Sequence, residues 1–525
     1  MKIKKTLLFL LLLLSFSSCQ KKIDPSWDIG VYAPIFNTSL NFGDIVADSN
    51  LVNNPDNFLS LNFQFNLTDY VLDSLSEFPD TISQNALPAL SGVVLHPGQT
   101  FFNFTEDTKL KIQNAEISRV DFCGGKLILE VNNTLTQNIF VTYKIPYAIK
   151  NGQPLEFTEM VPAATLGNTV HFSKSIDVAG YSLDMRGSTH MDCNTLTNTT
   201  IAILDPAGSQ ITLTDQDQFY FNVRLEKIKF SYAKGYFGSS SNVLGPDTTN
   251  MDIFNIFTSG SFDLDNVKMS LDVQNGFGMD ARVVFDKVST INTGTGHEIV
   301  FNDPIIGQTL NISRATETHN PASPVTPATY SFPLSNSNII NMLEDMPDKI
   351  SYQLHITTNP LGNISSGNDF VYKGNYLKTL LNLEIPLSLI ANDLTLADSV
   401  NWDLGEYRDN PSSGKLKLIA DNGFPFSADF QIYLIDANNH IADSLLVNSL
   451  IEAPALDADY KVITPRRTEF NIVLPADRYQ SFFLYKKAYL VAKFNTAGLD
   501  HYVKIYSTYD LKLKLTGDFT YTVGM

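Results

Sequence analysis

The chain has 525 residues, of which 43% are hydrophobic and 18% are charged. Because a single hydrophobic core stops growing at roughly 250–300 residues, this length predicts several domains. The 55 acidic residues outnumber the 37 basic ones and give a formal net charge of −18, which argues against nucleic acid and anionic lipid headgroups as partners.

The first nineteen residues have the pattern of a signal peptide. Lys2, Lys4 and Lys5 precede an apolar run from Thr6 to Leu14, and small residues then lead to Cys19. The run is too short to cross a hydrocarbon layer of about 30 Å, which distinguishes a secretory signal from a spanning helix.

The two serines directly before Cys19 make this stretch similar to the lipobox of bacterial lipoproteins, with Phe16 where leucine is usual. The resemblance implies cleavage after residue 18, a diacylglyceryl group on the Cys19 thiol, and an amino terminus acylated with palmitate or a similar chain. The alternative is an ordinary signal whose cysteine merely follows the cut. Two or more acyl chains hold a protein stably on a membrane, so we expect a tethered lipoprotein with most of its residues in water.

The run WDIGVYAPIFNTSLNFGDIV follows a short polar tether and contains Trp27-Asp28, Ala33-Pro34 and Thr38-Ser39-Leu40. It resembles the opening of Bacteroidota-type lipoproteins, a resemblance that implies an outer-membrane location and no particular activity. Surface-exposed lipoproteins of that group often carry acidic residues directly behind the cysteine, where this chain has Lys21 and Lys22. The location of the protein on the cell surface or on the periplasmic face of the outer membrane therefore stays undecided.

An internal repeat organises the rest of the chain. Three alternating apolar positions precede an asparagine in each of three segments, KLILEVNNTLTQNIFVTY, KMSLDVQNGFGMDARVVF and KLKLIADNGFPFSADFQIY, which begin at Lys126, Lys268 and Lys415. Period-two alternation resumes afterwards, so each copy predicts two antiparallel strands. Asn133, Asn275 and Asn422 begin the connections, with glycine next in the last two copies, and this favours a loop or bulge with positive φ.

The three asparagines are 142 and 147 residues apart, which is the size of one domain. We expect a signal peptide at 1–18, a tether and N-terminal β segment at 19–98, and β-domain repeats at 99–234, 235–370 and 371–525. Strands with one apolar face must bury it on a second sheet, so the predicted fold is all-β, with tandem antiparallel Ig-like β-sandwiches and a few short helices. One such helix is expected to be capped by Ser337.

Two cysteines remain besides Cys19. A disulfide between Cys123 and Cys193 is allowed in an oxidising compartment, provided that folding brings their Cα atoms within about 7 Å. The alternative is two thiols that pack as small hydrophobic side chains.

The sequence lacks the local motifs of common catalytic sites, such as Gly-x-Ser-x-Gly, a phosphate-binding loop or His-Glu-x-x-His. Its eight histidines are scattered, and no two of them stand at ligand spacing. We therefore expect no enzyme activity, no catalytic residues, no metal site and no cofactor. A hydrolase whose carboxylates meet only on folding stays open, because such a site leaves no local motif.

One aromatic pair could bind a ligand or a partner. Tyr236 and Phe237 stand between Gly235 and Gly238, in a stretch up to Asp247 whose glycines, serines and proline predict an exposed loop. Aromatic faces stack on sugars or anchor proteins because they bury much area for little entropy. The alternative is that the pair tucks back onto its own domain.

Five triplets match the O-glycosylation pattern of Bacteroidota-type bacteria, in which Asp precedes Ser or Thr and then an aliphatic residue or Thr. The residues that such a glycan would modify are Ser74, Thr81, Thr248, Ser399 and Ser444. Only triplets in accessible segments can carry a glycan.

Together these observations favour a non-enzymatic, outer-membrane-anchored lipoprotein that binds a protein partner or belongs to an envelope assembly, held to the membrane by lipid on Cys19. The alternative is a surface glycan-binding lipoprotein of a polysaccharide-uptake system. A row of exposed aromatic rings favours the glycan, whereas an apolar patch or an open strand edge favours a protein partner.

Overall fold

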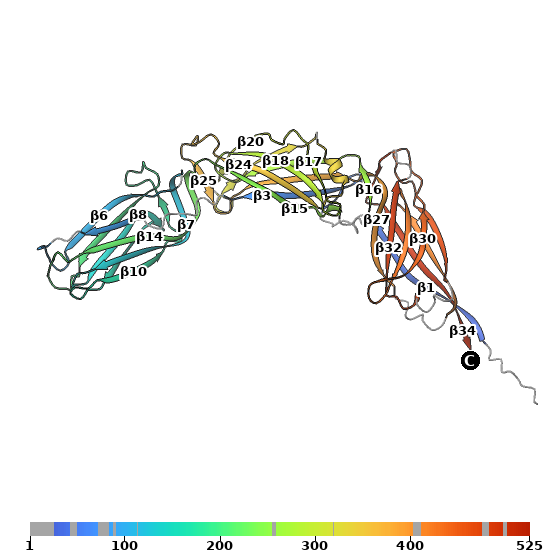
Figure 1. The fold of residues 1–525 in the computed structure, drawn as a ribbon, viewed down its shortest axis with the longest axis horizontal. Helices are drawn as coiled ribbons and strands as arrows, with labels where there is room; N and C mark the ends of the chain where they lie inside the picture. Colours follow the sequence, from blue (N-terminus) through green and yellow to red (C-terminus); the bar gives the residue numbers. More distant parts are fainter. Residues whose placement is uncertain are drawn as a thin grey trace, which may run out of the picture. The chain divides into compact units, whose positions relative to one another are not determined.

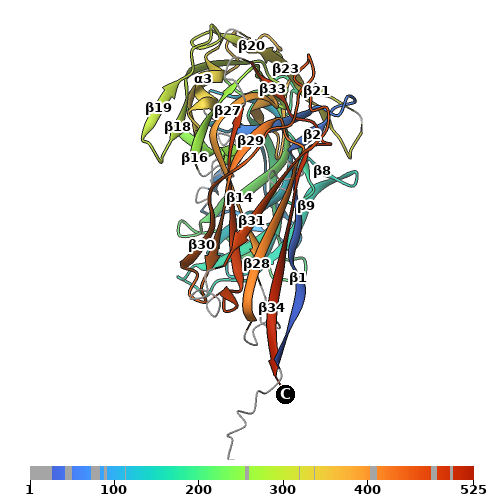
Figure 2. The same cartoon turned by 90° about the vertical axis from the view of Figure 1, so that its right-hand side faces the viewer.

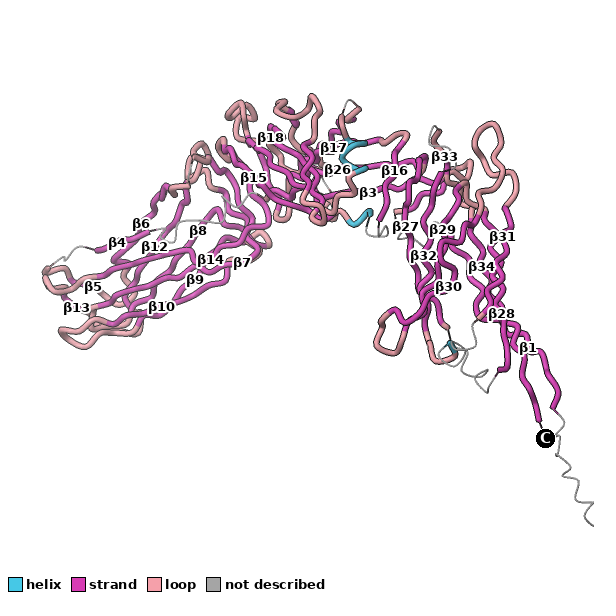
Figure 3. The backbone as a smooth tube through the Cα atoms, turned by 45° about the vertical axis from the view of Figure 1, so that its right-hand side comes forward, coloured by secondary structure: helices cyan, strands magenta, loops and turns pink. Residues whose placement is uncertain are grey.

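The structure, a computed structural model, describes residues 26–41, 50–71, 83–87, 91–112, 114–254, 259–318, 320–335, 337–402, 411–474, 482–496 and 501–524. Strands make up most of these residues, and helical segments such as η2 (Asp252–Phe254) and α3 (Ile339–Glu344) are short (Figure 3). The predicted all-β class, with antiparallel sandwiches, is confirmed.

Each copy of the sequence repeat contributes to a row of four antiparallel strands with the same strand order. The first strand in each row comes from the N-terminal segment, and the second is the one that lies last in the sequence. The third is the repeat strand that ends in asparagine, and the fourth is an edge strand. In the first sandwich these are β4 (Ser83–Leu87), β14 (Phe219–Tyr236), β7 (Glu116–Asn133) and β10 (Val170–Asp177). In the second sandwich they are β3 (Leu59–Tyr70), β26 (Leu377–Pro386), β17 (Lys268–Asn275) and β23 (Ala328–Pro333). In the third they are β1 (Ser26–Asn41), β34 (Asp510–Gly524), β28 (Pro411–Asn422) and β31 (Arg466–Val473).

The opposite sheets also share one order. They are β6 (Thr100–Lys109), β12 (Thr195–Leu204), β8 (Ile139–Lys150) and β9 (Gln153–Val161) in the first sandwich. In the second they are β15 (Ser240–Asn250), β24 (Lys349–Thr358), β18 (Ala281–Asn292) and β19 (His297–Val300). In the third they are β27 (Ser388–Asn401), β32 (Lys487–Thr496), β29 (Phe426–Ile435) and β30 (Ile441–Ile451), with β16 (Ser259–Leu264) beyond β27.

The described residues include nine further short strands. They are β2 (Leu51–Asn53), β5 (Val94–Leu95), β11 (Ser182–Asp184), β13 (Ile211–Thr212), β20 (Leu310–Ile312), β21 (Thr316–Glu317), β22 (Val325–Thr326), β25 (Asp369–Tyr372) and β33 (Val503–Lys504). Of these, β5 with β13 and β21 with β22 form two separate two-stranded sheets. β25 pairs with β14 beyond the end of β4, so a segment from the second half of the chain completes the first sandwich.

The chain divides by its contacts into two compact units. One consists of residues 1–62, 253–267 and 385–525, and the other of residues 63–252 and 268–384. These units differ from the contiguous ranges expected at 99–234, 235–370 and 371–525, because the N-terminal segment supplies β1, β3 and β4 to three different sandwiches. Figure 1 shows the blue strand β1 among the orange and red strands of the third sandwich.

The repeat asparagines are buried, with exposed fractions of 0% for Asn133 and Asn275 and 1% for Asn422. Each Oδ1 accepts a hydrogen bond from the backbone N–H two residues later, at 2.9–3.0 Å. Each Nδ2 donates to a carbonyl of a distant segment: Pro162, Ser313 and Glu452, respectively. The asparagine thus fixes both the start of the connection and the segment that crosses it.

The predicted positive φ at these connections is wrong. Neither the asparagines nor Gly276 and Gly423 have positive φ. The glycines are needed for a close approach instead, because a Cβ at Gly276 would lie 2.9 Å from the carbonyl oxygen of Tyr376, and one at Gly423 would lie 2.8 Å from that of Asp510.

The predicted cap of the short helix is also displaced. Helix α3 follows Asn338 rather than Ser337, and Asn338 makes no side-chain cap hydrogen bond. Its side chain instead accepts from the N–H of Asn302 at 2.8 Å and donates to the carbonyl of Val300 at 2.9 Å. The asparagine therefore ties the helix to the strand connection before it.

Candidate functional site

The predicted aromatic pair does not form an exposed platform. Tyr236 is the last residue of β14, opposite Glu116, and Phe237 packs against the core of the first sandwich. Both side chains are half-buried. Gly235 and Gly238 have positive φ, and Cβ atoms there would clash with the carbonyls of Glu116 and Asn114. Glycine at both positions therefore allows the segment to pack closely against these carbonyls. From Ser240 onward the expected loop is strand β15.

Cys123 and Cys193 are free thiols. Asn194, the neighbour of Cys193, accepts a hydrogen bond from the N–H of Ile117, whereas Cys123 lies further along β7. At about 3.3 Å per residue, the six steps from residue 117 to residue 123 correspond to roughly 20 Å, well beyond the reach of a disulfide. Burial raises the pKa of the half-buried Cys193 thiol, which lowers its reactivity.

Three of the five predicted O-glycosylation residues lie within the described ranges, whereas Ser74 and Thr81, like the lipidation residue Cys19, lie outside them. Thr248 and Ser399 are exposed and Ser444 is half-buried. In all three, the backbone N–H donates to the carboxylate of the preceding aspartate at 2.7–2.8 Å. All three residues lie in strands, in β15, β27 and β30.

Titratable side chains gather where β25 joins β14. The hydroxyl of Tyr372 donates to Glu317 at 2.8 Å, the rings of Tyr372 and Tyr232 are 4.7 Å apart, and the Arg119 guanidinium lies 5.4 Å from the Tyr232 ring centre. Burial, followed by the hydrogen bond to Glu317, raises the pKa of Tyr372 to about 12, and burial also raises the pKa of Tyr232. Both phenols are protonated at neutral pH and act as donors rather than as bases.

A neighbouring ion network is more deeply buried. Asp369 is 1% exposed and accepts hydrogen bonds from Arg314 at 3.1 Å and from Asn359 at 2.8 Å. Arg314 also pairs with Asp280, and Asn359 also donates to the carbonyl of Gly238. Because every carboxylate here has a partner, the network is suited to holding β25 in place. Within the described ranges, no group of three His, Cys, Asp or Glu side chains is placed to hold a metal ion.

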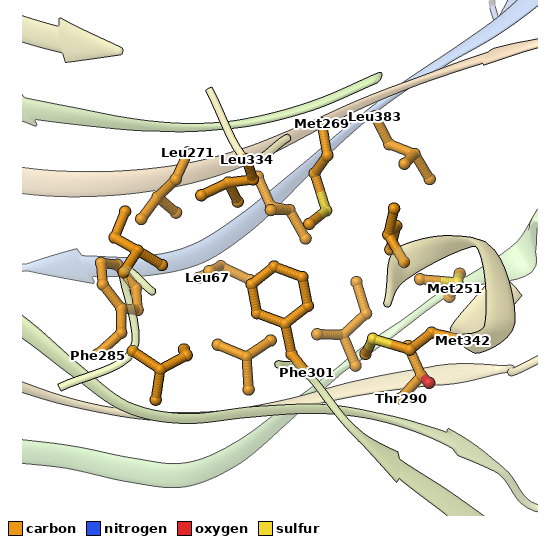
Figure 4. Close-up of a pocket in the computed structure, with 16 residues that line it drawn as sticks. Leu67, Met251, Met269, Leu271, Phe285, Thr290, Phe301, Leu334, Met342 and Leu383 are labelled. Atoms are coloured by element: carbon orange, nitrogen blue, oxygen red, sulfur yellow. The ribbon is translucent and has the colours of Figure 1, made fainter. Parts of the chain in front are cut away.

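An apolar cavity lies between the two sheets of the second sandwich, beside α3 (Figure 4). Its volume is about 30 Å³. Figure 4 shows Leu271 and Met269 on one side and Phe301 and Met342 on the other; Thr290 is the one polar residue of the sixteen that line it. Small-molecule sites are typically about 300–1,000 Å³, so this cavity has room for little more than a water or two, and Thr290 alone offers a polar group to orient a ligand.

The strand edges offer a different kind of site. β10, β23 and β31 occupy the same edge of their sheets, and the pairings in the described structure leave each with one strand neighbour. An unpaired edge presents backbone N–H and C=O groups that can add a strand from another chain. Proteins commonly protect such edges with charged side chains.

Two of the three edges are protected in this way. β31 carries Arg466, Arg467 and Glu469, whose side chains pair with Glu452, Asp421 and Lys417. β10 carries Lys174, which pairs with Glu159 at 2.6 Å. In contrast, β23 has the sequence ATYSFP and carries no charge.

The uncharged edge also carries two aromatic rings. Tyr330 and Phe332 stack with an interplanar angle of 12°, and each lies opposite a buried residue of β17, Val273 or Leu271. Both rings are half-buried, and the Tyr330 hydroxyl donates to Ser313 at 2.8 Å. Thr329 and Ser331 point to the exposed face. Residues 328–333, which we call the β23 edge, are therefore the best candidate site for strand addition.

No family model and no curated protein sequence matches this chain. Among solved structures, it is similar to a protein of Parabacteroides distasonis inferred to be secreted, with a TM-score of 0.27 and 9% identity over 94% of this chain and 99% of that one. A second similar structure is that of the tandem CBM22 domains of Paenibacillus barcinonensis Xyn10C, with a TM-score of 0.13 and 9% identity over 56% of this chain and 94% of that one. A third is a structure of infectious bursal disease virus, strain Gx, with a TM-score of 0.12 and 8% identity over 87% of this chain and 81% of that one. TM-scores this low carry no inference about function.

Among the residues that the structure describes, no helix has the length and hydropathy needed to span a membrane.

Proposed function

We propose that this chain is a lipid-anchored protein of the outer membrane that binds a protein partner by strand addition at the β23 edge, as a subunit of an envelope assembly and without catalysing a reaction. The observation that carries the proposal is the contrast among three equivalent edges. Charges line β10 and β31, whereas β23 is uncharged and carries two stacked, half-buried rings. An added strand gains affinity from backbone hydrogen bonds and specificity from pockets for alternate side chains.

The anchor in this proposal is the acylated Cys19, which is supported by the lipobox-like sequence. It places the partner among proteins of the outer membrane or its adjoining surfaces. The glycan-binding alternative gains no support from Tyr236 and Phe237, because both rings are half-buried.

The test is site-specific photo-crosslinking in cells that express the natively lipidated chain. A photoreactive residue replaces Ser331 on the β23 edge in one variant and Ser173, an exposed residue of the charged edge β10, in the control. We expect one protein to crosslink stoichiometrically at residue 331 and not at residue 173. Equal crosslinking at both positions, or none at either, contradicts strand addition at β23.

A second pair of variants separates binding from anchoring. Thr329→Lys combined with Ser331→Lys places two charges on the β23 edge and should abolish recovery of the partner. Ser173→Lys combined with Ser175→Lys makes the same change on β10 and should leave recovery unchanged. Mass spectrometry of the N-terminal peptide then reports the acylation of Cys19 independently of either pair.

A further inference from the structure

The paired ends of β1 and β34 present an apolar surface. Trp27 lies opposite Val523, and Ile29 lies opposite Tyr521. Directly opposed residues of an antiparallel pair share one face, so these four side chains form a single surface, which we call the ribbon tip. Trp27, Ile29 and Val523 are 47%, 44% and 42% exposed. Figure 2 shows the two strands side by side as far as the C-terminus.

The ribbon tip continues the core-facing side of its sheet. The next opposed pair on this face is Val31 and Phe519, and Phe519 is completely buried in the third sandwich. Two residues further along, the same face becomes half-exposed. The tip therefore has the composition of an interior surface in a place where the sandwich leaves it open to solvent.

Charge is nearly absent from this end of the ribbon. Between Ser26 and Pro34, and between Phe519 and Val523, the single charged residue is Asp28. Asp28 lies opposite Thr522, on the other face, and accepts a hydrogen bond from its hydroxyl at 2.8 Å. Tryptophan and tyrosine with aliphatic neighbours suit the boundary between lipid headgroups and acyl chains, where aromatic residues are enriched.

The tip is also close in sequence to the expected lipid. Residues 20–25 separate Cys19 from Ser26. Even if fully extended, this segment spans no more than roughly 25 Å. An acylated Cys19 therefore keeps the tip within that distance of the bilayer surface.

We propose that the ribbon tip is a membrane-contact surface that inserts Trp27 and its neighbours into the interface of a zwitterionic phospholipid bilayer. The inference rests on the proposed lipid anchor and adds a second, non-covalent contact that orients the third sandwich on the membrane. Zwitterionic lipid fits better than anionic lipid because the net charge of the chain is −18.

Tryptophan fluorescence tests this directly because the chain has two tryptophans, Trp27 and Trp402, and Trp402 is completely buried. The chain from residue 20 onward, with an N-terminal hexahistidine tag in place of Cys19, is tethered to phosphatidylcholine vesicles that contain a nickel-chelating lipid. The vesicles are made with and without brominated acyl chains. The difference between the unmodified chain and Trp27→Phe gives the emission of Trp27 alone.

We expect brominated lipid to quench the Trp27 emission and to leave the Trp402 emission of Trp27→Phe unchanged. Ile29→Ser should weaken the quenching, whereas Tyr32→Ser should not, because Tyr32 is 79% exposed on the opposite face of the same strand. A Trp27 that stays unquenched at the tethered surface overturns the inference and leaves the anchor proposal standing. A natively expressed chain without acyl groups on Cys19 overturns the anchor proposal, whatever the tethered chain does.

Discussion

The side-chain amide of Asn275 donates a hydrogen bond to the carbonyl oxygen of Ser313, 38 residues later, at 2.9 Å. The same amide donates to the carbonyl of Met279, and its oxygen accepts from the N–H of Phe277. One fully buried side chain thus satisfies three backbone groups around a single strand connection. Asn422 makes the equivalent three contacts in the third sandwich.

We expect Asn275→Ala to destabilise the second sandwich by about 2–4 kcal/mol. The substitution leaves buried backbone groups without partners, and each such group costs about 1–3 kcal/mol. The measurement is chemical denaturation followed by far-UV circular dichroism, because both tryptophans lie in the third sandwich. Asn302→Ala, which removes an exposed asparagine side chain from the same sandwich, is the control and should change the stability little. Equal effects of the two substitutions would mean that the buried amide is not structural.

Leu383→Ala should lower the stability by about 2–5 kcal/mol. Leu383 is 2% exposed and lines the apolar cavity of the second sandwich, so its removal enlarges a void among buried side chains. Leu361→Ala is the matched control, because Leu361 is 68% exposed. Thermal unfolding of both variants checks the prediction, and a small effect at Leu383 would show that the lining collapses around the gap.

Acid should weaken the first sandwich partly through Asp107. The hydroxyl of Ser188, and then that of Thr197, donates to this carboxylate and holds its pKa below the usual 3.8. The folded state therefore binds fewer protons than the unfolded state. The stabilisation is complete above the ordinary aspartate pKa and is lost as the pH falls through the lowered one.

The corresponding measurement is the stability of the unmodified chain and of Asp107→Asn at pH 7 and at pH 2. The difference in the free energy of unfolding between the two proteins should be larger at pH 7, where Asp107 is ionised. The asparagine is neutral at both pH values. Asp192→Asn, which removes a charge from an exposed position on the turn before β12, controls for a general charge effect. A difference that is constant with pH would contradict the role of the ionised carboxylate.

Residues 371–525 should not fold on their own, although they contain a whole copy of the sequence repeat. This fragment lacks β1 and β16, which pair with β34 and β27 at the edges of its two sheets. Because Ser26 lies opposite Gly524, a short Asn-Gly turn can join residues 26–41 behind residue 524. We expect this fusion, which still lacks β16, to be more stable than the fragment alone and than a fusion with residues 26–41 scrambled.

The repeat and the antiparallel sandwiches could be predicted because alternation is a local signal, visible at Leu127, Leu129 and Val131. The shared N-terminal segment could not, since the pairing of Ser26 with Gly524 joins residues at opposite ends of the chain and leaves no local pattern. The sequence singles out the asparagines but predicts turn chemistry for them, because nothing near Asn275 indicates the carbonyl of Ser313.

The sequence also contains a signal for the β23 edge. Its sequence ATYSFP has no charge, whereas the equivalent strands beginning at Val170 and Arg466 do, and comparing the three copies position by position reveals the difference. The ribbon tip was visible only as Trp27 behind the tether. Its exposure depends on where the third sandwich ends, which the sequence does not indicate.

The antiparallel pairing of β1 with β34 determines how the molecule responds to mechanical force. A pull on the N-terminal end against the body of the third sandwich loads the whole ladder from Ser26↔Gly524 to Asn41↔Asp510 in shear, so that many hydrogen bonds must break together. A pull that separates residue 26 from residue 524 breaks the same ladder one hydrogen-bonded pair at a time. We therefore expect this strand pair to resist tension applied between residue 26 and the third sandwich, and to separate more easily when residues 26 and 524 are drawn apart.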